Sequence, residues 1–161
     1  MEKAYIYKTQ VGRFLIVEED GAVTKVELHV EEERSKEEIL SHYQEEETTL
    51  MKDASIQLAQ YLEGSRKTFD ININPKGTQF QKKVWEALRA IPYGETRTYK
   101  EIAIEVGNPK ASRAVGMANN KNPIICIIPC HRVIGSNGKL VGFACGLDVK
   151  ERLLGIESNK G

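Results

Sequence analysis

The chain has 161 residues, about the length of one domain or of two small units that share an interface. Hydrophobic residues make up 40% and charged residues 29%, an ordinary globular composition with enough apolar side chains for a real core. Lys and Arg number 23, as do Asp and Glu, so the net charge is zero and argues against a uniformly basic nucleic-acid-binding protein. Yet residues 1–74 hold 9 basic and 16 acidic side chains, whereas residues 75–161 hold 14 and 7. An acidic half is joined to a basic half, and the basic half can still face an anionic partner.

The sequence shows no sign of a membrane protein or of an exported one. No apolar run approaches the about 20 residues that span a bilayer, and the N-terminus lacks the apolar core of a signal peptide. We therefore expect a cytoplasmic protein without a membrane partner. Three cysteines, Cys126, Cys130 and Cys145, are an odd number and make a disulfide framework a poor interpretation. Each is a core residue, a metal ligand or a reactive thiol.

The acidic half begins with a predicted antiparallel meander. Residues 4–9, 14–17 and 23–30 are rich in β-branched and aromatic side chains, and Gly12 and Asp20-Gly21 lie between them as turn signals. Residues 31–47 are acidic and poor in apolar side chains, which predicts a loop with at most one helical turn.

A helix and one more strand complete the acidic half. Apolar side chains share one helical face over residues 50–62, and residues 69–73 alternate as in a strand. The segment 74–77, Asn-Pro-Lys-Gly, breaks the pattern where the charge changes sign. We therefore expect an N-terminal α/β domain in residues 1–74 and a mainly helical domain in residues 75–161, a mixed α/β fold.

The basic half contains two predicted capping boxes. Thr78 to Gln81 opens a helix that continues to Ile91, and Thr98 to Glu101 opens a short helix to about Val106. Gly107-Asn108-Pro109 is a tight turn, with Pro109 suited to the first position of the next, basic helix. This layout is typical of a DNA-binding helix-turn-helix, and equally of a helical hairpin in a core. A final helix is predicted over residues 149–154, with Gly155 as its stop.

The chemistry is concentrated in Pro129-Cys130-His131-Arg132, which follows an apolar run over residues 124–128. Nearby positive charge favours the thiolate form of a cysteine. Adjacent side chains of an extended segment point to opposite faces, so Cys130 and His131 need a bend or a bridging water to communicate. Two other interpretations stay open at this point: a purely structural Cys-His pair, and a zinc site made by Cys126, Cys130, His131 and Cys145.

The basic half resembles the O6-alkylguanine-DNA alkyltransferase family, also called methylated-DNA:protein-cysteine methyltransferases. The motifs that carry the resemblance occur in order along the chain: Phe80-Gln81, Val84-Trp85, Ile91 to Gly94, Thr98-Tyr99, Gly107 to Pro109, Arg113 to Gly116, Asn122-Pro123, Pro129 to Val133, and Gly142 to Glu157. The acidic half resembles the family's variable N-terminal domain only in the order of its strands and helix.

The resemblance implies repair of double-stranded DNA that contains O6-alkylguanine, bound through the minor groove. The second helix of the helix-turn-helix would approach the groove closely because its side chains are small. The implied DNA-binding residues are Tyr99, Lys110, Ala111, Arg113, Ala114 and Gly116. The damaged base would be flipped out of the stack, with Arg113 filling its place and Tyr99 crowding the phosphate.

The resemblance also implies suicidal alkyl transfer to Cys130. His131 would take the thiol proton through a water, Glu157 would orient the imidazole, and Asn122 would brace the turn. The implied substrate pocket comprises Tyr99, Ile125, Val133, Phe143, Ala144 and Cys145. No cofactor and no metal are expected, and the protein is expected to act as a monomer.

The sequence departs from the family pattern at three pocket positions. Ile125 stands where a second proline is usual, and Ala144 and Cys145 stand where Ser and Gly are common. We expect Cys145 to narrow the pocket, so that Cys145→Gly reacts faster with a benzyl-substituted guanine. We also expect Lys110, Arg113, Lys121 and Arg132 to face phosphates, so salt weakens DNA binding.

Two functions of other classes stay open beside alkyl transfer. A non-catalytic relative that only binds lesions would lack the reactive cysteine, whereas Cys130 is present. A DNA-binding regulator would use the helix-turn-helix alone and would leave the Cys-His-Arg stretch without a role.

Overall fold

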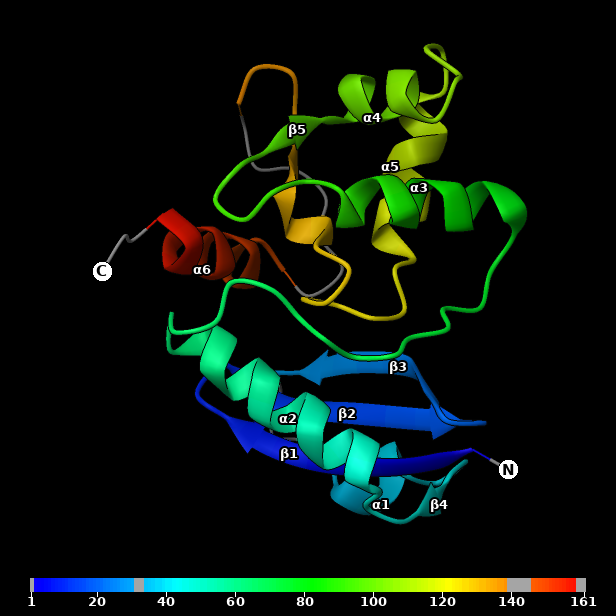
Figure 1. The fold of residues 1–161 in the computed structure, drawn as a ribbon, viewed down its shortest axis with the longest axis vertical. Coiled ribbons are helices and arrows are strands. Elements are labelled where there is room, and N and C mark those ends of the chain that lie inside the picture. The colour runs from blue at the N-terminus through cyan, green and yellow to red at the C-terminus, as the bar shows by residue number, and fades with distance from the viewer. Residues whose placement is uncertain (1, 31–33, 139–145, 159–161) are drawn as a thin grey trace. The chain divides into compact units, whose positions relative to one another are not determined.

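The structure is a computed structural model that describes residues 2–30, 34–138 and 146–158. The chain forms two compact units (Figure 1). The first comprises Met1–Pro75 together with Pro123–Ile125, and the second comprises Lys76–Asn122 and Cys126–Gly161. The fold is the expected mixed α/β fold, with an antiparallel sheet in the first unit and mainly helices in the second.

The predicted meander is confirmed as β1 (Lys3–Thr9), β2 (Gly12–Glu19) and β3 (Ala22–His29), paired antiparallel in sequence order. Asp20 and Gly21 both have positive φ, 54° and 79°, which suits a tight turn between twisted strands. A two-residue strand, β4 (Gln44–Glu45), pairs parallel with β1, so the sheet order is β3-β2-β1-β4. The sequence did not predict this short edge strand.

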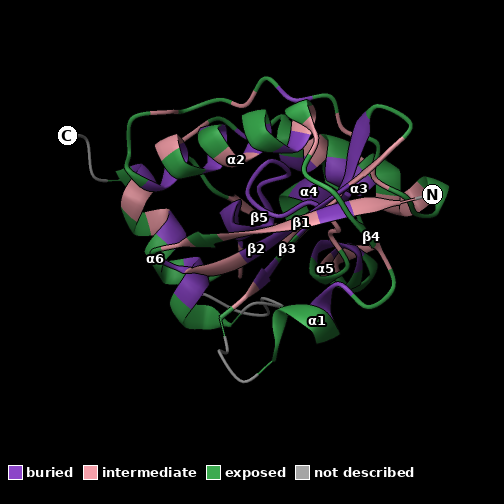
Figure 2. Ribbon diagram, turned by 90° about the horizontal axis from the view of Figure 1, so that it is seen from below, coloured by how far each residue is buried: buried purple, intermediate pink, exposed green. Residues whose placement is uncertain are grey.

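Both faces of the central strand β2 are covered. Leu15 and Val17 pack against Ile39 and Leu40 at the end of α1 (Lys36–Ile39), the helical turn expected in the acidic loop. Phe14 and Ile16 alternate with them, point to the other face and are also buried. The predicted helix is α2 (Thr49–Leu62), which contacts β1, β2 and β3 and buries one side, as its alternating purple and green bands show (Figure 2).

The strand expected over residues 69–73 is wrong. Only Ile73 forms a bridge, to Val23 of β3, with Val23 N donating to Asn72 O at 2.9 Å and Asn74 N donating to Val23 O at 2.8 Å. In this parallel register the residues before Ile73 lie beside the Asp20-Gly21 turn rather than beside a strand, so the pairing does not extend over them. A second extended piece from the basic half, Pro123–Ile125, bonds to both backbone groups of Val26. These two segments supply partners to β3, the edge strand of the sheet.

The second unit begins with the two predicted capping boxes, and both are confirmed. Thr78 caps α3 (Gln79–Arg89) and Thr98 caps α4 (Tyr99–Glu105). In each box the side chain three positions later accepts a hydrogen bond from the backbone N of the capping threonine. The core-facing side of α3 carries Trp85, whose Nε1 donates to Ala118 O of α5 at 2.9 Å. Helix α4, the turn after it and α5 (Ser112–Asn120) form the expected helix-turn-helix.

Two helix ends differ from the prediction. Helix α5 begins at Ser112, so Pro109 and Lys110 lie in the turn before it. The last helix, α6 (Leu147–Ser158), continues through Gly155 for one more turn. Glycine in a helix costs about 1 kcal/mol relative to alanine, and the buried contacts of Glu157 in the following turn offset that cost. No helix in residues 2–30, 34–138 or 146–158 is long and apolar enough to cross a membrane.

Candidate active site

Cys130 is the first residue of a 3-10 turn, η1 (Cys130–Arg132). This turn is a bend of the kind that would let the side chains of Cys130 and His131 communicate. The backbone N of Cys130 donates to Ile128 O at 2.8 Å, and its side chain is only 3% exposed. In a 3-10 turn successive side chains lie about 120° apart rather than on opposite faces. After the turn, β6 (Val133–Ile134) pairs parallel with β5 (Arg97–Thr98), which places the predicted pocket residue Val133 in a buried position.

Glu157 is the centre of a buried polar cluster beside Cys130. One carboxylate oxygen lies 2.6 Å from Nε2 of His131 and accepts from Nη2 of Arg132 at 3.0 Å. The other accepts from Nε of Arg132 at 2.8 Å and from the backbone N of Gly94 at 3.0 Å. A carboxylate held by two charge-assisted bonds and a backbone donor is an ionised acceptor. Nε2 of His131 therefore carries its proton, and Nδ1 is the ring nitrogen available to exchange one.

Arg132 corrects one expectation, because it does not face phosphates. The side chain is buried, pairs with Glu157, and donates from Nη1 to Ile91 O at 2.7 Å. Its guanidinium also lies 5.7 Å from the ring centroid of Tyr93, within the range of a cation–π contact. The motif Ile91 to Gly94, which had no assigned role, thus supplies three of the contacts that hold Arg132 and Glu157.

Burial sets the protonation states of the site. Burial lowers the pKa of the His131 imidazole below 6.5, although the bond to Glu157 opposes the shift, so the ring is neutral at pH 7. Burial raises the pKa of the Tyr99 phenol, and the neighbouring Cys130 raises it further, so Tyr99 is a neutral donor. A neutral imidazole can accept a proton from a thiol, and a neutral phenol can donate one hydrogen bond.

The side chain of Asn122 bonds to the backbone just before Cys130, because its Nδ2 donates to Ile128 O at 2.7 Å. Ile125 is buried and belongs to the first unit, where its backbone N donates to Val26 O. Three further predicted pocket residues, Phe143, Ala144 and Cys145, lie outside the described residues.

The predicted DNA-binding residues lie on α5 and the turn before it, except Tyr99, which is the first residue of α4. Arg113, Ala114 and Lys110 are exposed, whereas Ala111 and Gly116 are half-buried. A Cβ on Gly116 would lie 3.8 Å from the Tyr99 ring, so the ring packs directly on this helix. Sequence reasoning passed over Met117, which is 64% exposed and the most exposed large apolar side chain among the described residues. Met117 lies four residues after Arg113 and therefore on the same face of α5, which is the sequence signal that could have grouped it with the predicted DNA-binding residues.

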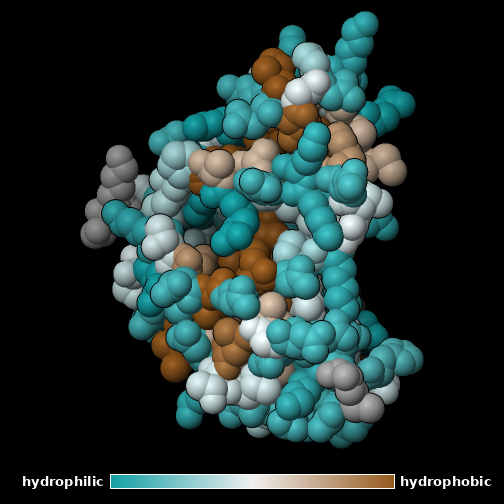
Figure 3. Space-filling model, turned by 45° about the vertical axis from the view of Figure 1, so that its right-hand side comes forward, coloured by the Kyte–Doolittle hydropathy of each residue, from teal (hydrophilic) through white to brown (hydrophobic). Residues whose placement is uncertain are grey.

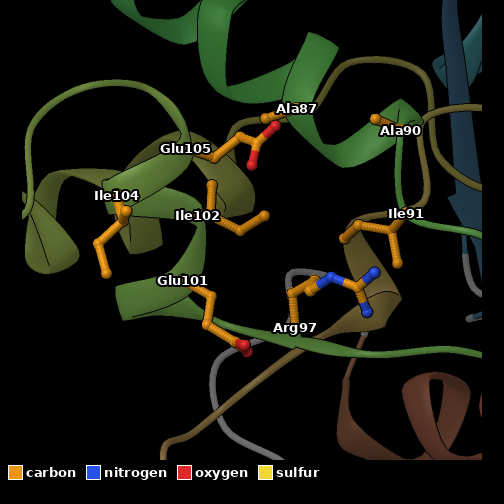
Figure 4. Close-up of a pocket in the computed structure, with 8 residues that line it drawn as sticks. All are labelled: Ala87, Ala90, Ile91, Arg97, Glu101, Ile102, Ile104 and Glu105. Carbon is orange, nitrogen blue, oxygen red and sulfur yellow. The ribbon is translucent and has the colours of Figure 1, made fainter.

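The pocket drawn in Figure 4 is a different feature. It lies between the C-terminal end of α3 and the side of α4, with Ile91 and Ile102 directed into it and Arg97 at one side. Cys130 does not line it. Hydrophilic side chains cover most of the face in Figure 3, as the composition predicts. Among the described residues, no group of three His, Cys, Asp or Glu side chains is arranged to hold a metal ion.

A helix-turn-helix protein with a buried cysteine beside a histidine–glutamate pair is the class that fold and site define. Residues 79–159 match the family description "6-O-methylguanine DNA methyltransferase, DNA binding domain", and residues 3–75 match "6-O-methylguanine DNA methyltransferase, ribonuclease-like domain". The chain belongs to the O6-methylguanine DNA methyltransferase family, which confirms the resemblance.

Individual relatives match almost the whole chain. A methylated-DNA–protein-cysteine methyltransferase of Methanosarcina acetivorans is 50% identical over 96% of this chain and 97% of its own. The constitutive protein of that name in Bacillus subtilis is 44% identical over 93% and 92%. The crystal structure of Mycobacterium tuberculosis OGT in complex with DNA is 38% identical, with a TM-score of 0.84 over 98% of this chain and 92% of the other.

Proposed function

We propose that the protein repairs alkylated DNA by direct reversal, moving the alkyl group from O6 of guanine to Sγ of its own Cys130. It is a methylated-DNA–protein-cysteine methyltransferase that acts once per molecule. The observation that carries this proposal is the pair of His131 Nε2 and Glu157, 2.6 Å apart and buried next to Cys130. The chemistry belongs to residues 75–161, and the relatives named for the same activity support it.

Double-stranded DNA is the partner, bound in the minor groove by α5. The exposed face of α5 has a cation, Arg113, next to a small side chain, Ala114, and such a face can approach the groove floor closely. The mycobacterial relative crystallised with DNA supports DNA as the partner. The protein acts as a monomer, and its place in the cytoplasm stays a prediction.

The lesion is flipped out of the stack, because an alkyl group on O6 is out of reach of a buried thiol while the base is paired. Arg113 fills the vacated space with its planar guanidinium. Tyr99, fixed against Gly116 on one side and close to Cys130, crowds the backbone at the target and donates to the flipped base.

Transfer then follows from the protonation states. The thiol proton of Cys130 passes through one water to Nδ1 of His131. The Nε2–H of His131 remains hydrogen-bonded to the Glu157 carboxylate throughout. The thiolate attacks the alkyl carbon in line, so the S–C bond forms as the C–O6 bond breaks and its electron pair leaves with guanine. Guanine takes up one proton and becomes the normal base. The thioether has no leaving group comparable to guanine, so one molecule repairs one lesion without a cofactor.

Mass spectrometry after incubation with duplex DNA containing O6-methylguanine tests the proposal. We expect one added methyl on the peptide with Cys130, and none in the Cys130→Ser protein. Unmodified DNA of the same sequence is the control. Methylation of Cys126 or Cys145 instead would overturn the assignment of the nucleophile, and no methylation at all would overturn the activity.

A further inference from the structure

Met117 is a large apolar side chain in the middle of the exposed face of α5. It is 64% exposed, the highest value among the large apolar side chains of the described residues. The opposite face of the helix is buried through Val115, Ala118 and Asn119. At about 100° per residue, Met117 falls at the centre of the arc formed by the exposed positions. Those positions are Arg113, Ala114, Met117, Asn120 and, at the C-cap, Lys121.

Two cations flank this methionine. Arg113, Met117 and Lys121 follow one another at intervals of four residues, so neighbours in this row are about 6 Å apart along the helix axis. Residues 112–120 include no acidic side chain, so nothing on α5 itself neutralises the pair of cations. A face with cations at both ends and an apolar centre fits a partner with phosphates at its rims and bases between them. The minor groove of DNA, the partner of the proposed function, has this form.

The methionine differs in size from the side chains beside it. Ala114 and Gly116 are small and let the backbone of α5 come close to the floor of the groove. Met117 extends well beyond both of them on an unbranched, flexible thioether. When α5 lies in the groove, Met117 is therefore the apolar side chain that meets the floor.

The floor of the minor groove differs between base pairs in one hydrogen-bond donor. Every pair presents acceptors there, and a G·C pair adds the 2-amino group of guanine. A thioether is only a weak acceptor, so it excludes water from this amino group without replacing the lost hydrogen bond. A·T pairs have no such donor on the floor. A methionine on the floor therefore fits A·T pairs better than G·C pairs.

We propose that Met117 is a specificity-determining residue: its side chain lies on the minor-groove floor and disfavours base pairs that carry a guanine 2-amino group. The spacing of about 6 Å from Arg113 corresponds to at most about two base pairs of 3.4 Å each. This inference rests on the proposed function, which supplies the minor-groove position of α5 and puts Arg113 in the place of the lesion. The pairs that Met117 contacts are then close neighbours of the lesion, and repair is faster where they are A·T.

Lesion-free duplexes of alternating repeat sequence test the proposal, because a repeat offers the same floor in every register. One duplex contains only A·T pairs, one only G·C, one only inosine·C and one only 2,6-diaminopurine·T. Inosine is guanosine without the 2-amino group and 2,6-diaminopurine is adenine with it, so the floor changes while the major-groove edge stays the same. Fluorescence anisotropy gives the Kd of each duplex at one fixed salt concentration. We expect the unsubstituted protein to bind the two amino-free duplexes about five- to tenfold more tightly than the two that carry the amino group.

Variants at position 117 assign the preference to this side chain. In Met117→Ala the contact with the floor is lost, and we expect the four Kd values to agree within about twofold. Met117→Gln keeps the length and the helix propensity but has an amide oxygen that accepts from the 2-amino group, so it binds the amino-bearing duplexes more tightly than the unsubstituted protein does. Ile56→Ala removes an exposed apolar side chain of α2 in the first unit and is the matched control, with the preference retained.

A preference for amino-free duplexes that persists in Met117→Ala overturns the proposal, and so does equal binding of the unsubstituted protein to all four duplexes. A different pattern, with inosine·C like G·C and 2,6-diaminopurine·T like A·T, follows the major-groove edge. That pattern overturns the minor-groove position of α5 in the proposed function, and this inference with it. Because no duplex carries a lesion, a failure of methyl transfer to Cys130 leaves these results unchanged and is distinguishable from them.

Discussion

The two units of the molecule bury polar side chains of different kinds. Among the described residues of the first unit, the buried polar side chains are Thr24 and Gln57, both neutral. In the described part of the second unit, they include His131, Arg132, Lys150 and Glu157, all four of which carry charge or can exchange a proton. Burying charge is costly unless every group is paired, and such clusters gather at functional sites. The described core of the first unit thus avoids the cost of buried charge, whereas the second unit accepts that cost around a reactive thiol.

The largest effect should follow from removing the charge of Glu157, which bonds to both His131 and Arg132. Glu157→Gln keeps the shape but leaves the Arg132 guanidinium buried without its anion, so we expect a loss of about 3–5 kcal/mol in the free energy of unfolding, measured with urea. Glu151→Gln, an exposed carboxylate of the same helix, should change it by less than about 0.5 kcal/mol. Equal losses in the two variants would remove the distinction between the units.

Packing in the second unit should give the next largest effect. A Cβ on Gly77 would lie 2.5 Å from Cη2 of Trp85, a ring buried in the core, so Gly77→Ala should cost about 1–3 kcal/mol in urea unfolding. The matched control is Gly155→Ala: this glycine is helical and a Cβ there meets nothing within 4 Å. The control should be neutral or stabilise by up to about 1 kcal/mol. Destabilisation by both would point to backbone conformation rather than the contact with Trp85.

The neutral polar site of the first unit should matter less than the charged one. Gln57 accepts from Asp70 N at 2.8 Å and donates to Asp70 O at 3.2 Å, tying the segment after α2 to the helix. Gln57→Leu leaves two backbone groups of Asp70 without these partners, and we expect a loss of about 1–2 kcal/mol. Lys52→Leu, exposed on the same helix, should lie within about 0.5 kcal/mol of the unsubstituted protein. A loss from Gln57→Leu as large as that from Glu157→Gln would show that buried charge in the second unit is no more costly to disturb than a neutral buried amide in the first.

The smallest effect concerns pH. The folded-state pKa of His131 is lowered below 6.5, mainly by burial, so between that lowered value and 6.5 the unfolded chain binds more protons than the folded one. Stability that is present above pH 6.5 is therefore lost as the pH falls, with a slope of up to about 1.4 kcal/mol per pH unit. We expect His131→Gln to flatten this part of the stability curve, and the exposed His42→Gln to leave it unchanged. A curve that keeps its slope in His131→Gln would assign the effect to other groups.

Local features of the fold could be predicted from the sequence. The capping boxes at Thr78 and Thr98, the turn at Asp20-Gly21 and the helical face of α2 all depend on residues within a few positions of one another. The strand over residues 69–73 was wrong because an alternating pattern does not say whether a partner strand continues beside it. The short strand β4 was missed for the related reason that its partner, β1, lies about 40 residues away.

The nucleophile and its histidine could be predicted from the sequence, whereas the buried ion pair that holds them in place could not. Cys130 and His131 are adjacent in the sequence, so the motif shows them together. Arg132 and Glu157 are 25 residues apart, and only the fold shows that they form one ion pair. Gly155 looked like a helix end, which would have left Glu157 in a solvated tail. Long-range pairing of charges leaves no periodic signal, which is why Lys150 and Arg132 had no expected buried role.

The bridge between Val26 and Pro123–Ile125 bears on how the molecule can be dissected. The chain leaves the first unit at Pro75, contributes a whole helix-turn-helix, and then returns for three residues before it reaches Cys130. A fragment that starts at Lys76 would carry away a piece that pairs with β3, and a fragment that ends at Pro75 would lack it. Neither half is a self-contained module. The order of synthesis adds a constraint, because the sheet cannot complete this edge until residues 123–125, about 100 positions after β3, have left the ribosome.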